Sequence, residues 1–431
     1  MNYYSLNHQA PVVDFGTATL LGQAPDKGLY FPEHIPQVEA AFVRNMHTYS
    51  KAAIGLQVMA PYVGNTIPKH ILATIIEETL EQEFPIIPLN NTTHVVELFN
   101  GPTLAFKDVG ARFMSRCLGY ITQHKKENIT VLVATSGDTG GAVASGFYNV
   151  PGVHVVILYP SGRVSKVQEL QLTTLGGNIT ALEVAGSFDN CQAMVKQAFA
   201  DEQLTASMTL TSANSINVAR WLPQQMYYWL TAAALQGTKP ATYVVPSGNF
   251  GNMAAGVLAH AMGMPSGGFV AACNANDVVP KHIRTGVYDT VPSVATISNA
   301  MDVANPSNYG RVQQLYALLN GAATLHAYTT SDALTRLTVQ DAYASNKYIL
   351  DPHTAVGVQA WQQHVAATGS THLGMVMGTA HPIKFAEVIA PVLGITIPEP
   401  ASITKLHKLT KHSTKIDATY EQLKAELIRL R

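Results

Sequence analysis

One lysine stands where an amino group could act as a nucleophile. Lys107 follows the apolar residues Leu104 and Phe106, and a helical pattern begins at about this point, reading FKDVGARFM. A lysine at a helix start opposes the helix dipole, and burial by the apolar neighbours further disfavours its charged form. Both effects lower the pKa of the amino group and suit it to form a Schiff base with a carbonyl compound. The alternative is a surface lysine paired with Asp108.

A glycine-rich junction could bind a phosphate group. The hexapeptide SGNFGN at 247–252 joins an apolar run at 241–246 to the small-residue helical pattern MAAGVLAHAMG. Glycines let backbone N–H groups turn inward, and a helix N-terminus adds partial positive charge, so a phosphate can bind there without Lys or Arg. The alternative is a tight turn with no ligand. The hexapeptide matches neither GxxxxGK[ST] nor GxGxxG, so the common nucleotide motifs are absent.

A second junction, TSGDTGG at 135–141, is rich in small hydroxyl residues. Hydroxyl groups and N–H groups at a helix N-terminus suit a carboxylate, whereas an ordinary helix cap would use only one or two of these residues. A Schiff-base lysine, an uncharged phosphate loop and a carboxylate loop are three parts that pyridoxal-phosphate enzymes need together. The combination therefore indicates that kind of cofactor.

The elements that must position these loops alternate along the chain. Helical patterns occupy 47–63 and 67–84. From about residue 95, runs rich in Val, Ile and Leu alternate with small-residue helices, at 129–134, 153–159, 178–184, 241–246, 269–273 and 372–378. Continuous apolar strands that alternate with helices predict a parallel sheet covered on both faces, with the loops after its strands lining a ligand crevice. The end of the chain, YEQLKAELIRLR, predicts an amphipathic helix.

Composition narrows the class of protein. The 431 residues carry a formal net charge of -1, which gives no electrostatic footprint for nucleic acid or an anionic membrane. The three cysteines are far apart and form no CxxC, which favours reduced thiols in the cytoplasm and no metal site. The N-terminus lacks the pattern of a signal peptide, and the apolar runs are too short to span a bilayer. We expect a soluble cytoplasmic protein with a small-molecule substrate.

Six segments, in order and approximate spacing, resemble the long bacterial and fungal threonine synthases: LFNGPTLAFKD, ATSGDTGGA, SANSINVAR, VPSGNFGN, SNAMDV and GTAHPIKF. The resemblance extends over nearly the whole chain, to about residue 395. It implies a lyase that uses pyridoxal phosphate to convert O-phospho-L-homoserine and water into L-threonine and phosphate, the last step of threonine biosynthesis. We expect a monomer or a homodimer.

The resemblance also implies a fold. It is the α/β fold of the fold-type-II pyridoxal-phosphate enzymes, similar to the tryptophan synthase β chain, with two parallel-sheet α/β domains and a helical N-terminal cap. We expect the cap at 1–92 and the large cofactor-binding domain at 93–111 and 206–400. The small domain would be 112–205, and 401–431 would form a helical C-terminal tail.

The residues that match the family's site can be assigned one by one. Lys107 matches the Schiff-base lysine, and Thr379 matches the hydroxyl residue that faces the pyridine nitrogen. Asp138 stands where related enzymes often have an Asn beside the phenolic oxygen of the cofactor. The loop that binds the cofactor phosphate matches Gly248, Asn249, Phe250, Gly251 and Asn252.

The substrate side is carried over in the same way. The loop for the substrate carboxylate resembles Ser136, Gly137 and Thr139, and the residues that hold the substrate phosphate resemble Asn214, Ser215 and Arg220. Arg163 and Lys166, in PSGRVSK, are weaker candidates for that phosphate.

The chain departs from the family pattern at one visible position and leaves rival functions open. Asn100 replaces a His that usually precedes GPT, so His94, His353 and His381 are other imidazoles that could reach the substrate. The rivals are a serine or threonine dehydratase, a non-catalytic protein that binds pyridoxal phosphate, and a nucleotide-binding module. The second phosphate site in SANSINVAR argues against a dehydratase, and the intact lysine and carboxylate loop argue against a non-catalytic protein.

Overall fold

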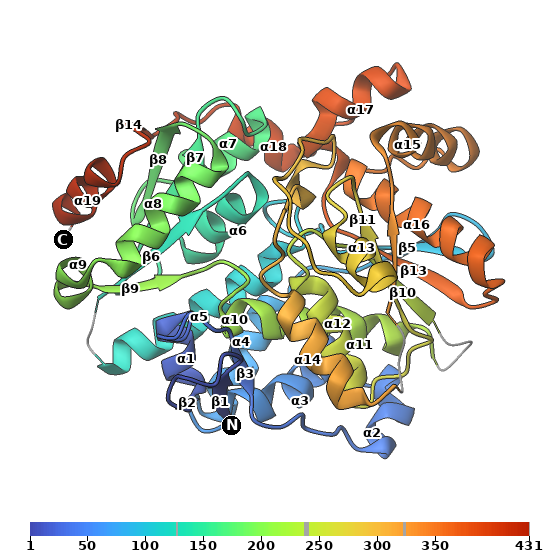
Figure 1. The fold of residues 1–431 in the computed structure, drawn as a ribbon, viewed down its shortest axis with the longest axis horizontal. Coiled ribbons are helices and arrows are strands. Elements are labelled where there is room, and N and C mark those ends of the chain that lie inside the picture. The colour runs from blue at the N-terminus through green and yellow to red at the C-terminus, as the bar shows by residue number, and fades with distance from the viewer. Residues whose placement is uncertain (126–127, 237–240, 322–324, 431) are drawn as a thin grey trace.

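Two parallel β-sheets lie side by side, each between layers of helices (Figure 1). The computed structural model describes residues 1–125, 128–236, 241–321 and 325–430. The six-stranded sheet has the order β12-β11-β10-β13-β5-β4, and only its edge strand β4 is antiparallel to its neighbour. Its strands are β4 Ile86–Pro88, β5 Thr93–Glu97, β10 Ala241–Pro246, β11 Phe269–Cys273, β12 Leu325–Thr329 and β13 Leu373–Gly378.

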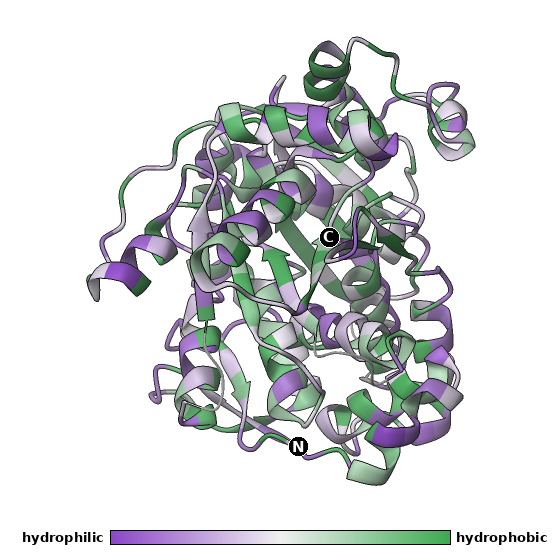
Figure 2. Cartoon of the chain, turned by 90° about the vertical axis from the view of Figure 1, so that its right-hand side faces the viewer, coloured by the Kyte–Doolittle hydropathy of each residue, from purple (hydrophilic) through white to green (hydrophobic). Residues whose placement is uncertain are grey.

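Both faces of the six-stranded sheet are buried, which explains why its strands are continuously apolar. In the register of the central strands, Val244 lies opposite Val270 on one side and Val376 on the other. These three valines pack in one core with α16 (Pro352–Thr368). Tyr243 points to the opposite face of the sheet, where it belongs to a second core that includes α12 (Gly251–Ala261). The strands at the centre of the molecule are accordingly mostly hydrophobic (Figure 2).

The five-stranded sheet has the order β14-β8-β7-β6-β9 and is parallel throughout. Its strands are β6 Ile129–Ala134, β7 Val153–Pro160, β8 Ile179–Ala185, β9 Thr209–Ser212 and β14 Thr414–Asp417. One face is covered by α8 and α19, and the other by α5, α6 and α7. These helices are α5 Lys107–Lys125, α6 Asp138–Phe147, α7 Lys166–Thr173, α8 Phe188–Ala200 and α19 Tyr420–Arg429.

The C-terminal tail is not helical throughout, because β14 extends the five-stranded sheet by pairing with β8. Four residues with one buried side chain, Ile416, are too short a pattern to reveal a strand, and only the free edge of β8 makes them one. β9 also belongs to this sheet, since it pairs with β6, although it follows residue 205, where the sequence placed the end of the small domain. Helix α18 (Ala401–Leu406) precedes β14, and α19 is the amphipathic helix that the sequence indicates.

The N-terminal region packs beneath both sheets and contains strands as well as helices (Figure 1). A small antiparallel sheet has the order β2-β1-β3, and the hydroxyl of Tyr3 in β1 donates to the carbonyl of Tyr62 in α3 at 2.7 Å. The elements are β1 Asn2–Ser5, β2 Val13–Asp14, α1 Phe15–Leu21, β3 Tyr30–Pro32, α2 Ala40–Asn45, η1 Met46–Thr48, α3 Lys51–Val63 and α4 Lys69–Thr79.

The remaining elements connect the strands or cover the six-stranded sheet. They are α9 Glu202–Ser207, α10 Val218–Trp221, η2 Leu222–Gln224, α11 Gln225–Ala234, α13 Val278–Thr285, η3 Asn299–Met301, α14 Tyr309–Leu319, α15 Asp332–Asn346, η4 Pro382–Phe385 and α17 Ala386–Leu393. None of the helices in the described ranges is long and apolar enough to cross a membrane. The three cysteines are buried free thiols.

Candidate functional site

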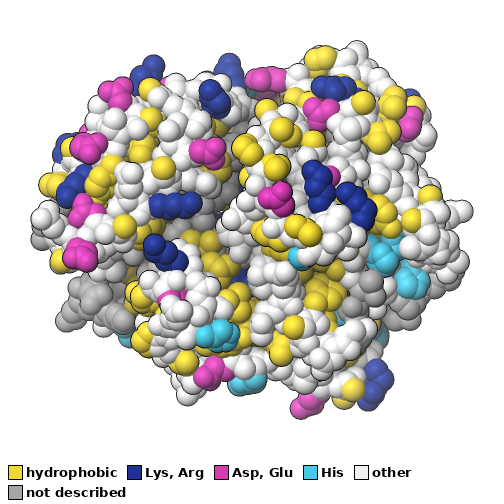
Figure 3. Space-filling model, in the orientation of Figure 1, with side chains coloured by type: hydrophobic (Ala, Val, Ile, Leu, Met, Phe, Trp, Pro, Cys, Tyr) yellow, Lys and Arg dark blue, Asp and Glu magenta, His cyan; other side chains and the backbone are white. Residues whose placement is uncertain are grey.

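A cavity of about 820 Å³ opens between the two sheets, where the loops after several parallel strands meet. The space-filling view shows this face hollowed between its two halves (Figure 3). β6 leads into α6 here, β10 leads into α12, and β13 ends just before Thr379. The cavity wall includes most of the residues assigned from the sequence: Lys107, Ser136, Asp138, Thr139, Arg163, Asn214, Ser215, Arg220, Gly248, Asn249, Phe250, Gly251, Asn252, His353 and Thr379.

The backbone around Lys107 is fixed from two sides. Lys107 is the first residue of α5, as the sequence indicates, and an isolated bridge pairs Ala105 with Ala380. The N–H of Phe106 donates to the carbonyl of Thr379 at 2.9 Å, and the hydroxyl of Tyr227 donates to the carbonyl of Phe106. These contacts place Lys107 and Thr379 on the same wall, although they lie far apart in the sequence.

The surroundings of Lys107 favour its neutral form. Burial lowers the pKa of Lys107, and so do the charges of Lys384 and Arg220, while Asp138 acts in the opposite direction. The pairing with Asp108 that the sequence left open is wrong. The Asp108 carboxylate is buried and accepts from the backbone N–H of Thr103 at 2.9 Å and from its hydroxyl. Lys107 therefore lies at the cavity wall with a lowered pKa and without an ion pair to Asp108, which favours its use as a nucleophile.

The loop at 247–252 has the features of a phosphate site. Phe250 is the N-cap of α12 and adopts a left-handed conformation, with φ 60°. The side-chain oxygen of Asn252 accepts from the hydroxyl of Tyr228 at 2.9 Å, whereas its Nδ2 has no partner among the described residues. A buried donor without a partner costs free energy, so a ligand oxygen here would stabilise it. Asn249 braces the loop by donating to the hydroxyl of Ser215 at 2.9 Å.

Gly248 in this loop is explained by a neighbouring segment of the chain. A Cβ on Gly248 would lie 2.6 Å from the Cα of Met301 and 3.0 Å from the carbonyl oxygen of Ala300. The glycine therefore lets η3 approach the loop closely. The segment around η3, from Pro292 to Ser307, supplies much of the cavity wall, and only its SNAMDV part stood out in the sequence.

The hydroxyl-rich loop before α6 presents some of its residues to the cavity and uses others internally. Ser136 and Thr139 line the cavity. The hydroxyl of Thr135 accepts from the N–H groups of Gly137 at 3.0 Å and Gly140 at 2.8 Å, which holds the loop in shape. Gly137 has φ 143°, and a Cβ there would lie 2.5 Å from the side chain of Gln168. Because the N–H of Gly137 already donates to Thr135, it is not free for a ligand, and Gly137 does not line the cavity.

Arg220 brings positive charge to the cavity from α10. One of its nitrogens, Nη1, donates to the carbonyl of Ala213, and its Nε has no partner among the described residues. No carboxylate in the described ranges forms an ion pair with Arg220, although it is buried. Burial lowers the pKa of Arg220 to about 10, so the side chain stays charged at neutral pH. The side-chain oxygen of the adjacent Asn214 also lacks a partner within the described chain.

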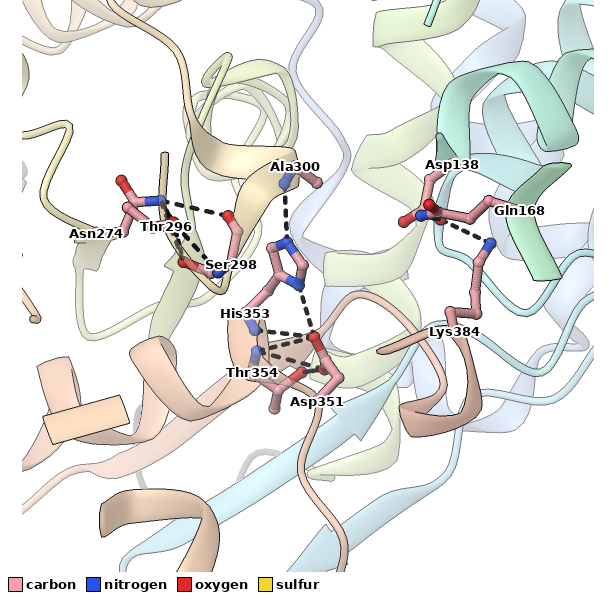
Figure 4. A network of polar contacts seen from close by, with 10 residues as sticks. All are labelled: Asp138, Gln168, Asn274, Thr296, Ser298, Ala300, Asp351, His353, Thr354 and Lys384. Carbon is pink, nitrogen blue, oxygen red and sulfur yellow. Dashed lines mark hydrogen bonds and ion pairs between the residues drawn. The ribbon is translucent and has the colours of Figure 1, made fainter. Parts of the chain in front are cut away.

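The histidines divide into one at the cavity and two away from it. His353 lines the cavity, but its Nδ1 is 2.9 Å from Asp351 and its Nε2 accepts from the N–H of Ala300 at 3.1 Å (Figure 4). Its Nε2 thus holds η3, while its Nδ1 is used at the N-terminus of α16. His94 and His381 lie outside the cavity wall, and His381 caps η4 by accepting from the N–H of Ile383 at 3.1 Å.

Asn100 and Lys166 also lie outside the cavity wall. The side chain of Asn100 is exposed and donates to Glu97 at 3.2 Å. The change from His to Asn at this position therefore touches no residue of the site in this structure. No group of three or more potential metal ligands comes together in the described part of the chain.

Two buried residues behind the wall were not singled out in the sequence. Lys384 lies 2.7 Å from the carboxylate of Asp138, and Gln168 donates to the same carboxylate at 2.9 Å (Figure 4). Lys384 belongs to GTAHPIKF, but nothing in that segment alone points to a partner in α6.

These residues fit pyridoxal phosphate. A lysine with a lowered pKa, an unpartnered amide donor beside a helix N-terminus and a hydroxyl residue at the end of β13 meet in one cavity, as the cofactor requires.

Comparisons with known proteins lead to the same cofactor. The family model described as pyridoxal-phosphate dependent enzyme matches residues 85–374, the threonine synthase N terminus matches 2–80, and the threonine synthase C-terminal region matches 354–427. The chain is 39% identical over 432 residues to the threonine synthase of Haemophilus influenzae, with 100% of both chains covered.

Solved structures agree along the whole chain. The crystal structure of threonine synthase from Escherichia coli is similar with a TM-score of 0.92 and 36% identity, covering 100% of both chains. The structure of PLP-bound threonine synthase from Brucella melitensis has a TM-score of 0.93 at 31% identity, covering 100% of this chain and 99% of that one. The fold-type-II architecture and the pyridoxal phosphate cofactor that the resemblance implied are thereby confirmed. The chain belongs to the threonine synthase family of pyridoxal-phosphate-dependent enzymes.

Proposed function

We propose that this chain converts O-phospho-L-homoserine and water into L-threonine and phosphate, with Lys107 as the residue that holds the cofactor. The observation that carries the proposal is the joint presence, in one cavity, of Lys107, two loops suited to anions and a buried Arg220 without a carboxylate partner in the described ranges. Such a cavity can bind a cofactor phosphate and a substrate phosphate at the same time. Membership of the family supports the same reaction.

On the cofactor side, the loop at 248–252 would hold the phosphate through its N–H groups and Asn252. Thr379 would offer a hydroxyl, in place of a carboxylate, to the pyridine nitrogen, and Asp138 would lie beside the phenolic oxygen. Without a carboxylate partner the nitrogen is less fully protonated, which moderates how strongly the ring withdraws electrons. When bound, pyridoxal phosphate supplies the electron sink that stabilises negative charge on the carbon atoms of the substrate.

On the substrate side, Ser136 and Thr139 would receive the carboxylate, while Gly137, whose N–H already donates to Thr135, would shape the loop between them. Arg220, with Asn214 and Ser215, would grip the phosphate that leaves from the γ carbon. Charged donors that are already in place stabilise a leaving phosphate without reorganisation. The exposed Arg163 at the cavity and Lys166 at the start of α7 could attract the substrate from solvent.

The proton transfers fall to Lys107 in this scheme. The amino group of Lys107 would remove the α proton of the bound substrate, and the lowered pKa of Lys107 favours this role as a base. A second proton would leave the β carbon as phosphate departs from the γ carbon. The γ and α carbons would then each regain a proton, water would add its hydroxyl at the β carbon, and the remaining proton of that water would go to the released phosphate, so that the overall reaction balances. The segment at 292–305 lies over the cavity and would limit the access of further water.

We also propose a cytoplasmic monomer or homodimer. The domains would be those given above from the sequence, except that β9 and β14 pair within the five-stranded sheet and so belong with the small domain. A serine or threonine dehydratase is not favoured, because a dehydratase has no need for the second anion site around Arg220.

The experiment is an assay of purified protein reconstituted with pyridoxal phosphate. O-phosphohomoserine should yield phosphate and threonine in equal amounts, and a Lys107→Ala variant with a normal melting temperature should yield neither. Serine and threonine should give little 2-oxo acid in the same preparation. If 2-oxo acid formation exceeded phosphate release, or if no phosphate appeared, the proposed reaction would be wrong.

A further inference from the structure

A second lysine, Lys384, lies behind the cavity wall and does not form part of it. Lys384 is in η4, and its side chain is 1% exposed. Its Nζ is 2.7 Å from the carboxylate of Asp138 and donates to the carbonyl of Thr103 at 2.8 Å. Asp138, in contrast, lines the cavity together with Lys107. Lys384 can therefore act on the cavity only through Asp138.

The Asp138 carboxylate is buried and must be compensated. Burial raises the pKa of Asp138, but Lys384 and Lys107, together with hydrogen bonds from Lys384 and Gln168, hold it well below its usual range. Asp138 is thus a permanent negative charge at neutral pH, with one direct cationic contact, Lys384. A buried carboxylate without that contact would take the nearest other cation.

The nearest other cation on the cavity side is Lys107. Asp138 raises the pKa of Lys107, whereas burial, Lys384 and Arg220 lower it. The other titratable groups on neighbouring elements are already engaged: Asp108 with Thr103, Tyr227 with the carbonyl of Phe106, and His353 with Asp351 and Ala300. Burial has the largest effect on the pKa of Lys107, and among the charges that act on it Asp138 has the largest. The pairing of Asp138 therefore decides how strongly that charge opposes the effect of burial.

We propose that Lys384 is a positioning residue that keeps Asp138 in an ion pair of its own, so that the amino group of Lys107 has no carboxylate partner and stays available as a nucleophile. The proposal rests on Lys107 as the residue that binds the cofactor. It also gives the ion pair a structural place. Asp138 and Gln168 come from helices of the five-stranded sheet, while Lys384 and Thr103 come from loops beside the six-stranded sheet. The same contact therefore joins the two halves of the cavity.

The test follows covalent attachment of pyridoxal phosphate to Lys107 in the cofactor-free protein. The adduct is trapped with borohydride at timed intervals between pH 6 and 9, and mass spectrometry measures the modified peptide. In Lys384→Met, Asp138 should turn to Lys107, and attachment near pH 7.5 should slow about ten-fold, with the pH profile moved upward. The ten-fold factor follows because an opposite charge within a few ångströms raises the pKa of an amino group by about one unit or more.

A double variant separates charge from packing. Lys384→Met combined with Asp138→Asn removes the carboxylate as well, so the pH profile of attachment to Lys107 should move back down from its position in Lys384→Met toward that of the wild type. The position of the profile is compared and not the absolute rate, because Asp138 also borders the cofactor site. If Lys384 only fills space, the second change cannot restore the profile. Asp138→Asn alone leaves Lys384 unpaired, and its profile should move to lower pH. This single variant keeps the test decisive if Lys384→Met fails to fold.

Three results would overturn the proposal. The pH profile of Lys384→Met could match that of the wild type, the double variant could keep the shifted profile of the single one, or Asp138→Asn alone could leave the profile in place. The control is Lys107→Ala, which should give no adduct at this peptide. If the wild-type protein itself gave no adduct at Lys107, the function proposed above would fail and this inference with it, whereas the first three results overturn this inference alone.

Discussion

Removal of Arg220 tests the substrate-phosphate site. In Arg220→Ala the cavity loses its buried guanidinium, whose Nη1 is used on the carbonyl of Ala213 and whose Nε is free for a phosphate oxygen in the described structure. A hydrogen bond to a charged group contributes about 1.5–3 kcal/mol, and two such bonds to one phosphate are not additive. We therefore expect a loss of about 2–4 kcal/mol of transition-state stabilisation, which is about a thirty- to thousand-fold loss in kcat/KM.

The assay measures kcat, KM and melting temperature on one preparation, by phosphate release from O-phosphohomoserine. Because phosphate is the leaving group, kcat should fall as well as kcat/KM. The absorbance of the bound cofactor should be unchanged, since its phosphate is held by the loop before α12. Arg220→Lys keeps the positive charge but not the planar guanidinium, so its kcat/KM should lie between those of the wild type and Arg220→Ala.

The control variant is Arg284→Ala, which removes the same charge from an exposed position on α13, outside the cavity wall. Its kcat/KM should stay within about two-fold of the wild type, because an exposed charge at a distance is screened. The reasoning would be refuted if Arg220→Ala melted at a lower temperature but kept normal kinetics. Arg220 would then serve only to hold the carbonyl of Ala213.

Four further changes test other parts of the site and the fold. Lys107→Ala should abolish both threonine formation and the borohydride-trapped adduct, and a variant that kept a tenth of wild-type activity would contradict the role of Lys107. Asn252→Asp replaces an amide donor with a carboxylate, so the cofactor phosphate would lose a hydrogen bond in the proposed site. The dissociation constant for pyridoxal phosphate, measured by equilibrium dialysis, should rise about ten- to a hundred-fold. An unchanged constant would mean that the phosphate binds elsewhere. His353→Phe removes the acceptor for a backbone N–H in η3 and should speed hydrogen exchange there about five-fold, the equivalent of roughly 1 kcal/mol, whereas unaltered exchange would show that η3 is held by other contacts. Burial raises the pKa of Glu183, but hydrogen bonds and charge from Lys411 outweigh this effect and lower the pKa from 4.5 to about 2. The ionised Glu183 therefore stabilises the fold above pH 4.5, and this stabilisation is lost as the pH falls toward 2. The melting temperatures of the wild type and Glu183→Gln should converge over that interval, and a difference that stayed constant would exclude this ionisation as the cause.

Several parts of the site follow from local sequence. The helix that begins at Lys107 and the left-handed turn at Phe250 each depend on neighbours within a few residues. Apolar runs mark β6, β10 and β13, and in parallel sheets the loops after such strands gather at one edge. For this reason the amino-acid sequence is enough to identify the lysine and both anion loops.

Other parts could not be found in that way. The need for glycine at 137 depends on the side chain of Gln168 in α7, and the need for glycine at 248 depends on η3; both neighbours come from other parts of the chain. The strand β14 exists only because β8 offers it a free edge. Each of these features depends on a close contact between two separate segments, and neither segment's sequence indicates that the other lies beside it.

The sequence by itself predicted the types of group that line the cavity: a lysine at a helix start, two glycine-containing loops suited to anions and an arginine. The tertiary structure decided which of their charges are satisfied. In the structure, Arg220 forms no ion pair with a carboxylate of the described ranges, Asp108 accepts hydrogen bonds from Thr103, and Asp138 forms an ion pair with Lys384. The physical reason is that the pKa of a buried group depends on charges a few ångströms away in space, and these come from elements whose approach only the packing of the two sheets sets.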